Sequence, residues 1–171
     1  MVKKIVFIFI ISFVMVSCGS SKNVTGYKKP RKQIGQPSNS TNKPTIADKI
    51  VWTAVTYKGV PYKFGGMTKR GMDCSGLIYT SFKQRNVSIP RSSREMYAKS
   101  YEISLNKVKR GDLLFFKTSR KRGGVNHVGL VTSVKNKDIR FIHSTSSKGV
   151  IVTSLHTYYW KKAFVRAKRI L

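Results

Sequence analysis

The sequence has few acidic residues, and this shortage sets the charge of the whole chain. Its 171 residues contain 6 Asp and Glu against 34 Lys and Arg, which gives a formal net charge of +28. A surface this basic attracts polyanions such as nucleic acid, an anionic membrane or an acidic cell-wall polymer. The basic residues are spread along the whole chain, so they indicate anionic surroundings rather than a specific binding site.

Signatures of nucleic-acid binding and of metal binding are also absent. The sequence has no Cys/His zinc pairs, no run rich in Arg and Gly, and no aromatic signature of an RNA-binding sheet. Its three histidines and two cysteines do not stand at the short spacing typical of metal ligands. We therefore expect neither a nucleic-acid partner nor a metal site.

The first 17 residues have the pattern of an export signal. Two lysines precede an apolar run over residues 5–16, which is too short to span a bilayer but fits a secretory signal peptide. The run ends at Ser17-Cys18-Gly19, which resembles a bacterial lipobox, although Met15 stands where Leu is more usual. We expect cleavage before Cys18 and lipidation of its thiol. A plain signal peptide cut near Ser17 and an uncleaved anchor are the alternatives.

The residues after this signal predict a tether and then a folded domain. Residues 20–43 are mostly Ser, Asn, Lys, Thr, Gly and Pro, and such a segment buries too little apolar surface to offset the entropy of ordering. We interpret residues 18–43 as a flexible tether near anionic lipid headgroups, and residues 44–171 as the domain. A lipidated Cys18 is unavailable to Cys74, so we expect no disulfide.

Within the domain, the hydrophobic pattern predicts helices first and a sheet second. Apolar residues recur at helical spacing over 46–55 and again after Cys74, and a third helix is expected over 94–100. From residue 127 onward the pattern is all strand, and no internal repeat occurs. The expected strands cover residues 113–116, 127–134, 139–143, 149–152 and 163–171. The sequence therefore predicts one α+β domain, with N-terminal helices packed on an antiparallel sheet.

The segment Asp73-Cys74-Ser75-Gly76-Leu77 places a thiol at the expected start of a helix. If Asp73 is the N-cap, Cys74 lies in the first turn, where unpaired backbone N–H groups and the helix dipole favour a negative charge. The thiolate is the nucleophilic form of cysteine, and the small Ser75 and Gly76 leave room for a substrate carbonyl. A buried structural cysteine is the alternative, because free cysteine is among the most buried residue types.

Two histidines flank the expected hairpin. His127 opens one strand and His143 closes the next, with a turn at 135–138 between them. An antiparallel hairpin brings such positions near each other, and a cysteine nucleophile needs a base and a group that orients the base. A slip of one residue would put one histidine on the wrong face, so the arrangement depends on the register and on a bulge where one is needed. Otherwise both are ordinary strand-end histidines. We interpret His156, followed by residues 157–160, as structural.

Six motifs in the same order resemble the NlpC family of papain-like cell-wall cysteine peptidases. They are residues 61–66, 73–77, 90–93, 111–116, 126–130 and 141–150, and the likeness covers residues 46–171. The resemblance implies a circularly permuted papain-like fold, in which the cysteine helix packs against the sheet that carries both histidines. It also implies hydrolysis of peptidoglycan stem peptides, commonly at the bond between γ-D-glutamate and a diamino acid.

By position, the resemblance implies that Cys74 attacks the carbonyl, that His127 is the base, and that His143 orients His127. The expected mechanism runs through an ion pair between the Cys74 thiolate and protonated His127. No metal or organic cofactor is required. An amidase or an acyltransferase on the same scaffold, and a non-catalytic wall-binding lipoprotein, are the alternatives.

The resemblance also implies contacts to the substrate. Tyr62 matches a tyrosine near the thiol that helps to bind the substrate or the oxyanion. Asp73 and Ser75 match positions that, in some members, contact the free amino end of the substrate. The turn at 135–138 lies in a hairpin longer than usual. We expect a monomer anchored by its lipid in the cell envelope, at the outer membrane and facing the periplasm where a cell has two membranes.

Overall fold

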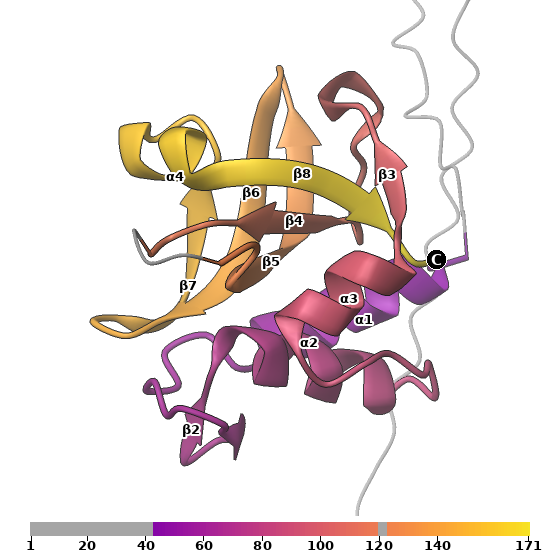
Figure 1. Ribbon diagram of the computed structural model, residues 1–171. Helices are drawn as coiled ribbons and strands as arrows, with labels where there is room; N and C mark the ends of the chain where they lie inside the picture. Colours follow the sequence, from indigo (N-terminus) through magenta and orange to yellow (C-terminus); the bar gives the residue numbers. More distant parts are fainter. Residues whose placement is uncertain (1–42, 120–122) are drawn as a thin grey trace, which may run out of the picture. The chain divides into compact units, whose positions relative to one another are not determined.

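The computed structural model describes residues 43–119 and 123–171 (Figure 1). The expected signal peptide (1–17), the lipidation site Cys18 and the expected tether up to residue 42 lie outside the described residues. Among the residues described, no helix has the length and apolar character needed to cross a bilayer.

The helices and strands that the hydrophobic pattern predicts are present in the predicted order, together with additional elements. In chain order they are α1 (Ile46–Val55), β1 (Met67–Thr68), β2 (Gly71–Met72), α2 (Cys74–Lys83), α3 (Ser93–Lys99), β3 (Tyr101–Ile103), the 3₁₀ turn η1 (Leu105–Lys107), β4 (Leu113–Phe116), β5 (His127–Lys135), β6 (Asp138–Thr145), β7 (Gly149–Ser154), α4 (Tyr158–Ala163) and β8 (Phe164–Arg169). Of these, β1, β2, β3, η1 and α4 are the additional elements. The α+β class is confirmed.

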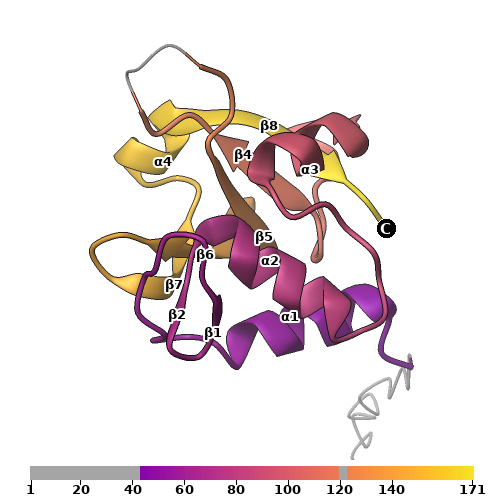
Figure 2. The same ribbon diagram turned by 60° about the horizontal axis from the view of Figure 1, so that its bottom comes forward.

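Six of the strands form one antiparallel sheet in the order β3-β8-β4-β5-β6-β7. Helices α1 and α2 pack on each other and on β5, and they cover one face of this sheet (Figures 1 and 2). The short β1–β2 pair lies beside the start of β7. The sheet therefore stands between the cysteine helix on one side and a smaller layer, which includes α4, on the other.

Strand β4 shows how the two faces are filled. Its four residues are apolar and fully buried, and they alternate between two cores. Leu113 and Phe115 face the helices, whereas Leu114 and Phe116 face the smaller core, where α4 packs. A strand buried on both faces needs such an unbroken apolar run, which is why the sequence predicted a central strand here.

Local capping signals start the helices where the sequence placed them. Asp73 caps α2, because its carboxylate accepts a hydrogen bond from the backbone N–H of Gly76 at 2.5 Å. Ser92 caps α3 in a capping box with Glu95. The expected cap at Asp73 is confirmed, and Cys74 is the first residue of its helix.

The hairpin between β5 and β6 contains the bulge on which the two histidines depend. Near the turn, Ser133 pairs with Arg140, but closer to the other end Val131 pairs with Phe141, so that Thr132 is an extra residue. Because side chains alternate between faces, the register at the turn would put His127 and His143 on opposite faces of the sheet. The extra residue moves the register by one and puts both on the same face.

The expectation of strands alone after residue 127 was wrong at residues 158–163, which form helix α4. Tyr and Trp favour strands, but tertiary contacts override that preference here. Tyr158 and Tyr159 are 81% and 55% exposed, whereas the ring of Trp160 packs among the aromatic side chains of the smaller core. In a strand, adjacent side chains face opposite sides, so the adjacent Tyr158 and Tyr159 could not both point outward as they do in this helical turn.

Candidate active site

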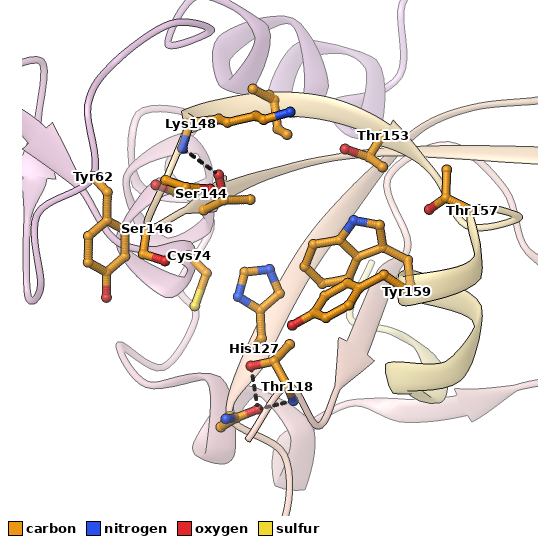
Figure 3. Close-up of a pocket in the computed structure, with 15 residues that line it drawn as sticks. Tyr62, Cys74, Thr118, His127, Ser144, Ser146, Lys148, Thr153, Thr157 and Tyr159 are labelled. Atoms are coloured by element: carbon orange, nitrogen blue, oxygen red, sulfur yellow. Dashed lines mark hydrogen bonds between the residues drawn. The ribbon is translucent and has the colours of Figure 1, made fainter. Parts of the chain in front are cut away.

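A cavity of about 640 Å³ opens where the N-terminus of α2 meets the sheet and α4 (Figure 3). Its lining includes Tyr62, Cys74 and His127, together with Thr153 from β7 and Trp160 from α4. Segments from the whole domain therefore converge on one site.

Cys74 lies half-buried at the first position of α2. Burial raises the pKa of its thiol, and the charge of Asp73 raises this pKa further, while the backbone N–H groups of Val128, Ser75 and Cys74 itself lower it. The net shift is upward. The sequence predicted a readily formed thiolate from the helix N-terminus alone, whereas burial acts in the opposite direction and favours the protonated thiol.

His127 stands beside this thiol. Figure 3 shows the sulfur of Cys74 and the imidazole of His127 turned toward one another, with Tyr62 on the other side of the sulfur. The Nε2 atom of His127 lies 3.0 Å from Nδ1 of His143, which leaves Nδ1 of His127 for the thiol. Burial lowers the pKa of His127 to about 4, although the charge of Asp73 opposes this shift. The ring is therefore neutral at pH 7.

His143 is fully buried and binds two partners at once. Its Nδ1 contacts His127, and its Nε2 lies 3.0 Å from the hydroxyl oxygen of Thr153. Burial and the neighbouring His127 lower the pKa of His143 to about 3. The structure thus links Cys74, His127, His143 and Thr153 in one row. Sequence reasoning found the first three residues and missed the fourth.

Trp160 is a second residue that sequence reasoning missed, because residues 157–160 were interpreted only as structural. Its ring stacks on His127 with a centroid distance of 5.2 Å and an interplanar angle of 26°, and it meets His143 edge to face at 4.4 Å. Nothing in the spacing of the sequence connects residue 160 to these histidines. The contact arises because α4 folds back over the sheet.

Tyr62 lines the cavity and is 37% exposed. Burial raises the pKa of its phenol, and negative charge at Asp73, or at Cys74 when it ionises, raises this pKa further. The group therefore keeps its proton and can donate a hydrogen bond into the cavity. This geometry suits the expected contact to a substrate or an oxyanion.

Asp73 and Ser75 lie behind the thiol and are 8% exposed each. The Asp73 carboxylate accepts hydrogen bonds from the backbone N–H groups of Gly76 and Gly65 and from Arg91, whose Nη2 lies 3.1 Å away. Arg91 also donates to the Ser75 hydroxyl at 2.8 Å. Neither residue is among the described residues that line the cavity, so the structure places both beside the site and occupies them with internal partners.

Direct contacts hold the cysteine half of the site against the histidine half. The Ser144 hydroxyl, next to His143, donates to the backbone carbonyl of Met72 at 2.7 Å. Gly76, in the first turn of α2, has no room for a side chain, because a Cβ atom there would lie 2.1 Å from the carbonyl oxygen of Gly66. The first contact holds the segment before α2 against strand β6, and the second holds the start of α2 against the loop before β1.

Curated proteins similar to this chain are peptidases and hydrolases. A protein named probable endopeptidase NlpC from Escherichia coli (strain K12) is 38% identical over 67% of this chain and 72% of its own length. A murein DD-endopeptidase and LD-carboxypeptidase, MepS, from the same strain is 32% identical over 74% of this chain and 64% of its own length. A γ-DL-glutamyl hydrolase from Bacillus subtilis (strain 168) is 37% identical, again over 74% of this chain but 30% of its own length.

Solved structures share the fold. A lipoprotein-like protein of the NLP/P60 family from Staphylococcus aureus superimposes with a TM-score of 0.64 and 31% identity, over 76% of this chain and 44% of that one. The domain of the peptidoglycan hydrolase SagA superimposes with a TM-score of 0.60 and 27% identity, over 72% of this chain and 98% of that one. These neighbours have the papain-like arrangement that the motifs implied. With the model of the NlpC/P60 family matching residues 59–169, the chain belongs to the NlpC/P60 family.

Proposed function

We propose that this protein is a cysteine endopeptidase that hydrolyses the stem peptides of peptidoglycan. The observation that supports this most directly is that Cys74 and His127 line one cavity, with the buried His143 behind them: Nε2 of His127 is bound to His143, and its other ring nitrogen is left for the thiol. A thiol, a base and an orienting group are the parts that nucleophilic acyl transfer requires. Relatives named murein and γ-glutamyl hydrolases support the substrate class.

In the proposed mechanism, proton transfer accompanies attack. Burial disfavours charge on both Cys74 and His127, so the free protein holds a neutral thiol–imidazole pair instead of the ion pair that the sequence predicted. As the sulfur approaches a substrate carbonyl, its proton passes to Nδ1 of His127. His127 then gives this proton to the leaving amine, and water hydrolyses the thioester.

The oxyanion formed on attack needs hydrogen-bond donors. The backbone N–H groups at the start of α2 and the protonated hydroxyl of Tyr62 are the proposed donors, since both stand next to the Cys74 sulfur. Removing one such donor typically costs about 3 kcal/mol of transition-state stabilisation. Asp73 and Ser75 remain proposed contacts to the amino end of the substrate. The Asp73 carboxylate would make this contact while it keeps its hydrogen bond with Arg91.

The charge of the cavity suits an anionic substrate. The described residues that line it carry nine hydroxyl groups, the ammonium group of Lys148 and no carboxylate. Five of the six acidic residues form ion pairs with arginine, and the sixth, Glu95, caps α3. No acidic side chain is therefore left to repel the carboxylates of stem peptides or other anionic groups of a cell wall.

The proposed bond is the one between γ-D-glutamate and the diamino acid. The B. subtilis relative named a γ-DL-glutamyl hydrolase favours this choice, whereas the name of the MepS relative favours a D,D bond. We further propose that residues 1–17 are removed, that Cys18 carries the lipid, that residues 18–43 are the tether, and that the domain of residues 44–171 acts as a monomer in the cell envelope, at the outer membrane.

Purified muropeptides and mass spectrometry test the proposal. The full chain in detergent should release a fragment that begins with the diamino acid, and Cys74→Ala should release none. The matched control, Cys18→Ala, removes the other cysteine and should leave cleavage of soluble muropeptides unchanged. Cleavage at the sugar–peptide bond, or transfer to an added amine, would indicate the amidase or the acyltransferase. No cleavage by the unmodified protein would favour a wall-binding protein and contradict the proposal.

A further inference from the structure

The row of hydrogen-bonding groups at the site does not end at the second histidine. His143 Nε2 lies 3.0 Å from the hydroxyl oxygen of Thr153, which belongs to the neighbouring strand β7. Thr153 lies diagonally across from His143, because His143 pairs with Ile151 and alternate residues share a face. The contact is thus built into the pairing of β6 with β7.

The positions of the protons decide whether His127 can act as a base. To accept the thiol proton on Nδ1, a neutral His127 must carry its own proton on Nε2, where it faces His143. Nδ1 of His143 must then accept, so the proton of His143 must sit on Nε2 and point at Thr153. In the opposite arrangement of tautomers, Nδ1 of His143 carries the proton and donates it in a hydrogen bond to Nε2 of His127. The proton of His127 then sits on its Nδ1, and no unprotonated nitrogen faces Cys74.

A histidine in the orienting position has this ambiguity because either ring nitrogen can carry the proton, whereas a carboxylate in that position can only accept. The surroundings offer His143 little else. The rings of Phe141 and Trp160 flank it at centroid distances of 4.6 and 4.4 Å, and Thr153 is the polar partner of its Nε2 among the described residues. The Thr153 hydroxyl can accept from Nε2–H or donate to a bare Nε2, so the direction of this hydrogen bond goes with one or the other arrangement.

We propose that Thr153 is a positioning residue that accepts a hydrogen bond from Nε2–H of His143 and thereby keeps the lone pair of His127 Nδ1 directed at Cys74. Thr153 also lines the cavity, so its own proton can be donated to a group in the cavity while its oxygen accepts from His143. This inference rests on the proposed function, because the base is needed only if Cys74 is a nucleophile.

The ionisable groups around this row are few. Cys74 and Asp73 face His127 from the start of α2, and Tyr62 approaches the thiol from the loop before β1. Helix α4 contributes the ring of Trp160 and the phenol of Tyr159, and β4 contributes the ring of Phe116. The ammonium group of Lys148 lines the same cavity. Imidazole ¹⁵N shifts distinguish the two histidines from these other groups.

Three variants test the proposal in the full chain. Thr153→Val removes the hydroxyl at nearly constant volume, Thr153→Ser keeps it, and Thr56→Val makes the same change at an exposed threonine at the end of α1, whose hydroxyl donates to the carbonyl of Thr53. Imidazole ¹⁵N chemical shifts at neutral pH give the protonated nitrogen of each ring. In the wild type and in Thr153→Ser, both His127 and His143 should be protonated at Nε2. In Thr153→Val, the Nδ1–H form of His143 should appear.

Kinetics provide the second measurement. Thr153→Val should lower kcat/KM on muropeptides by about tenfold, which is the cost of leaving one buried N–H without a partner. It should also slow alkylation of Cys74 by iodoacetamide at neutral pH. Thr153→Ser should restore both within about twofold, and Thr56→Val should change neither.

Two results would overturn the inference. One is a His143 protonated at Nδ1 in the wild type, and the other is a Thr153→Val protein with wild-type shifts and wild-type alkylation. The ¹⁵N shifts require no substrate, so they test the positioning role of Thr153 even if the wild type cleaves no muropeptide. In that case the proposed function fails while the proton arrangement stands.

Discussion

The two halves of the site are built in different ways. The nucleophile half is contiguous in sequence, because Asp73, Cys74 and Ser75 form the cap and first turn of α2. The imidazole half takes one residue from each of three strands and a ring from α4. A cap and the residue after it are fixed by local rules of helix formation, whereas cross-strand neighbours depend on register. The comparison teaches that local sequence sets the geometry of the first half, whereas in the second half the sequence identifies the two histidines but neither their register nor the contacts of Thr153 and Trp160.

The halves also differ in polarity. Asp73 is buried but has an ion pair with Arg91 and several backbone donors around it. His127 and His143 are buried among aromatic rings, where burial keeps them neutral. Charge is balanced in the first half and excluded from the second, so changes of charge should act on them differently.

The largest effect is expected from removing the base. His127→Gln should lower kcat on muropeptides by about 10³-fold, because general base catalysis commonly contributes 10²–10⁴-fold. His143→Gln should cost less, about 10²-fold, since it acts through His127. Circular dichroism of both variants checks that they fold. Equal losses in both variants would show that the two histidines do not have the separate roles proposed.

The second-largest effect is expected from lowering the pH, which should reduce the free energy of unfolding through the two histidines. In the unfolded chain, histidines take up protons near pH 6.5, but in the fold the pKa values of His127 and His143 are lowered to about 4 and about 3. The unfolded state therefore binds more protons between these values, and the free energy of unfolding should fall as the pH drops from 6.5 to 4. Each histidine contributes about 3 kcal/mol or less.

Urea unfolding between pH 7 and pH 4 measures this dependence. His127→Gln removes one of the two titrating groups, so its stability should depend less steeply on pH over the same range. A wild-type stability that does not change between pH 6.5 and pH 4.5 would contradict the burial of two neutral histidines.

A smaller effect is expected in the nucleophile half. Asp73→Asn keeps an oxygen for the N–H of Gly76 but leaves Arg91 without its carboxylate, and this should lower the free energy of unfolding by about 1–3 kcal/mol. The matched control is Asp48→Asn, which breaks an ion pair with Arg110 that is more exposed to solvent and should cost about 1 kcal/mol or less. Similar losses in both variants would show that burial adds nothing to the Asp73 pair.

The smallest effect should come from the hairpin turn that sets the register at one end. Asn136 and Lys137 both have positive φ, 50° and 66°, a conformation that glycine adopts without strain. Lys137→Gly should therefore raise the free energy of unfolding by about 1 kcal/mol and leave hydrolysis unchanged. Lys135→Gly, which places glycine within β5, should instead be destabilising. Thermal melting distinguishes the two variants. A lower melting temperature for Lys137→Gly would contradict the inference that the positive φ of Lys137 is strained.

Much of the fold followed from the sequence because the signals were local. The alternating and helical patterns gave α1, α2 and the hairpin strands, and Asp73 and Ser92 marked helix starts through capping. The expectation of strands alone after residue 127 missed α4 at 158–163, because three aromatic residues favour extended chain unless one ring is needed in the core. Local preference and tertiary contact conflict at that point, and the contact prevails.

The sequence by itself determined the family and the identity of the candidate nucleophile and histidines, because these residues stand in short motifs. Tertiary structure alone decided three features of the site. The bulge at Thr132 put His127 and His143 on one face, burial reversed the expected shift of the Cys74 pKa, and Thr153 and Trp160 arrived from β7 and α4. Each depends on which strand lies beside which and on how much water is excluded, and a linear pattern of residues encodes neither.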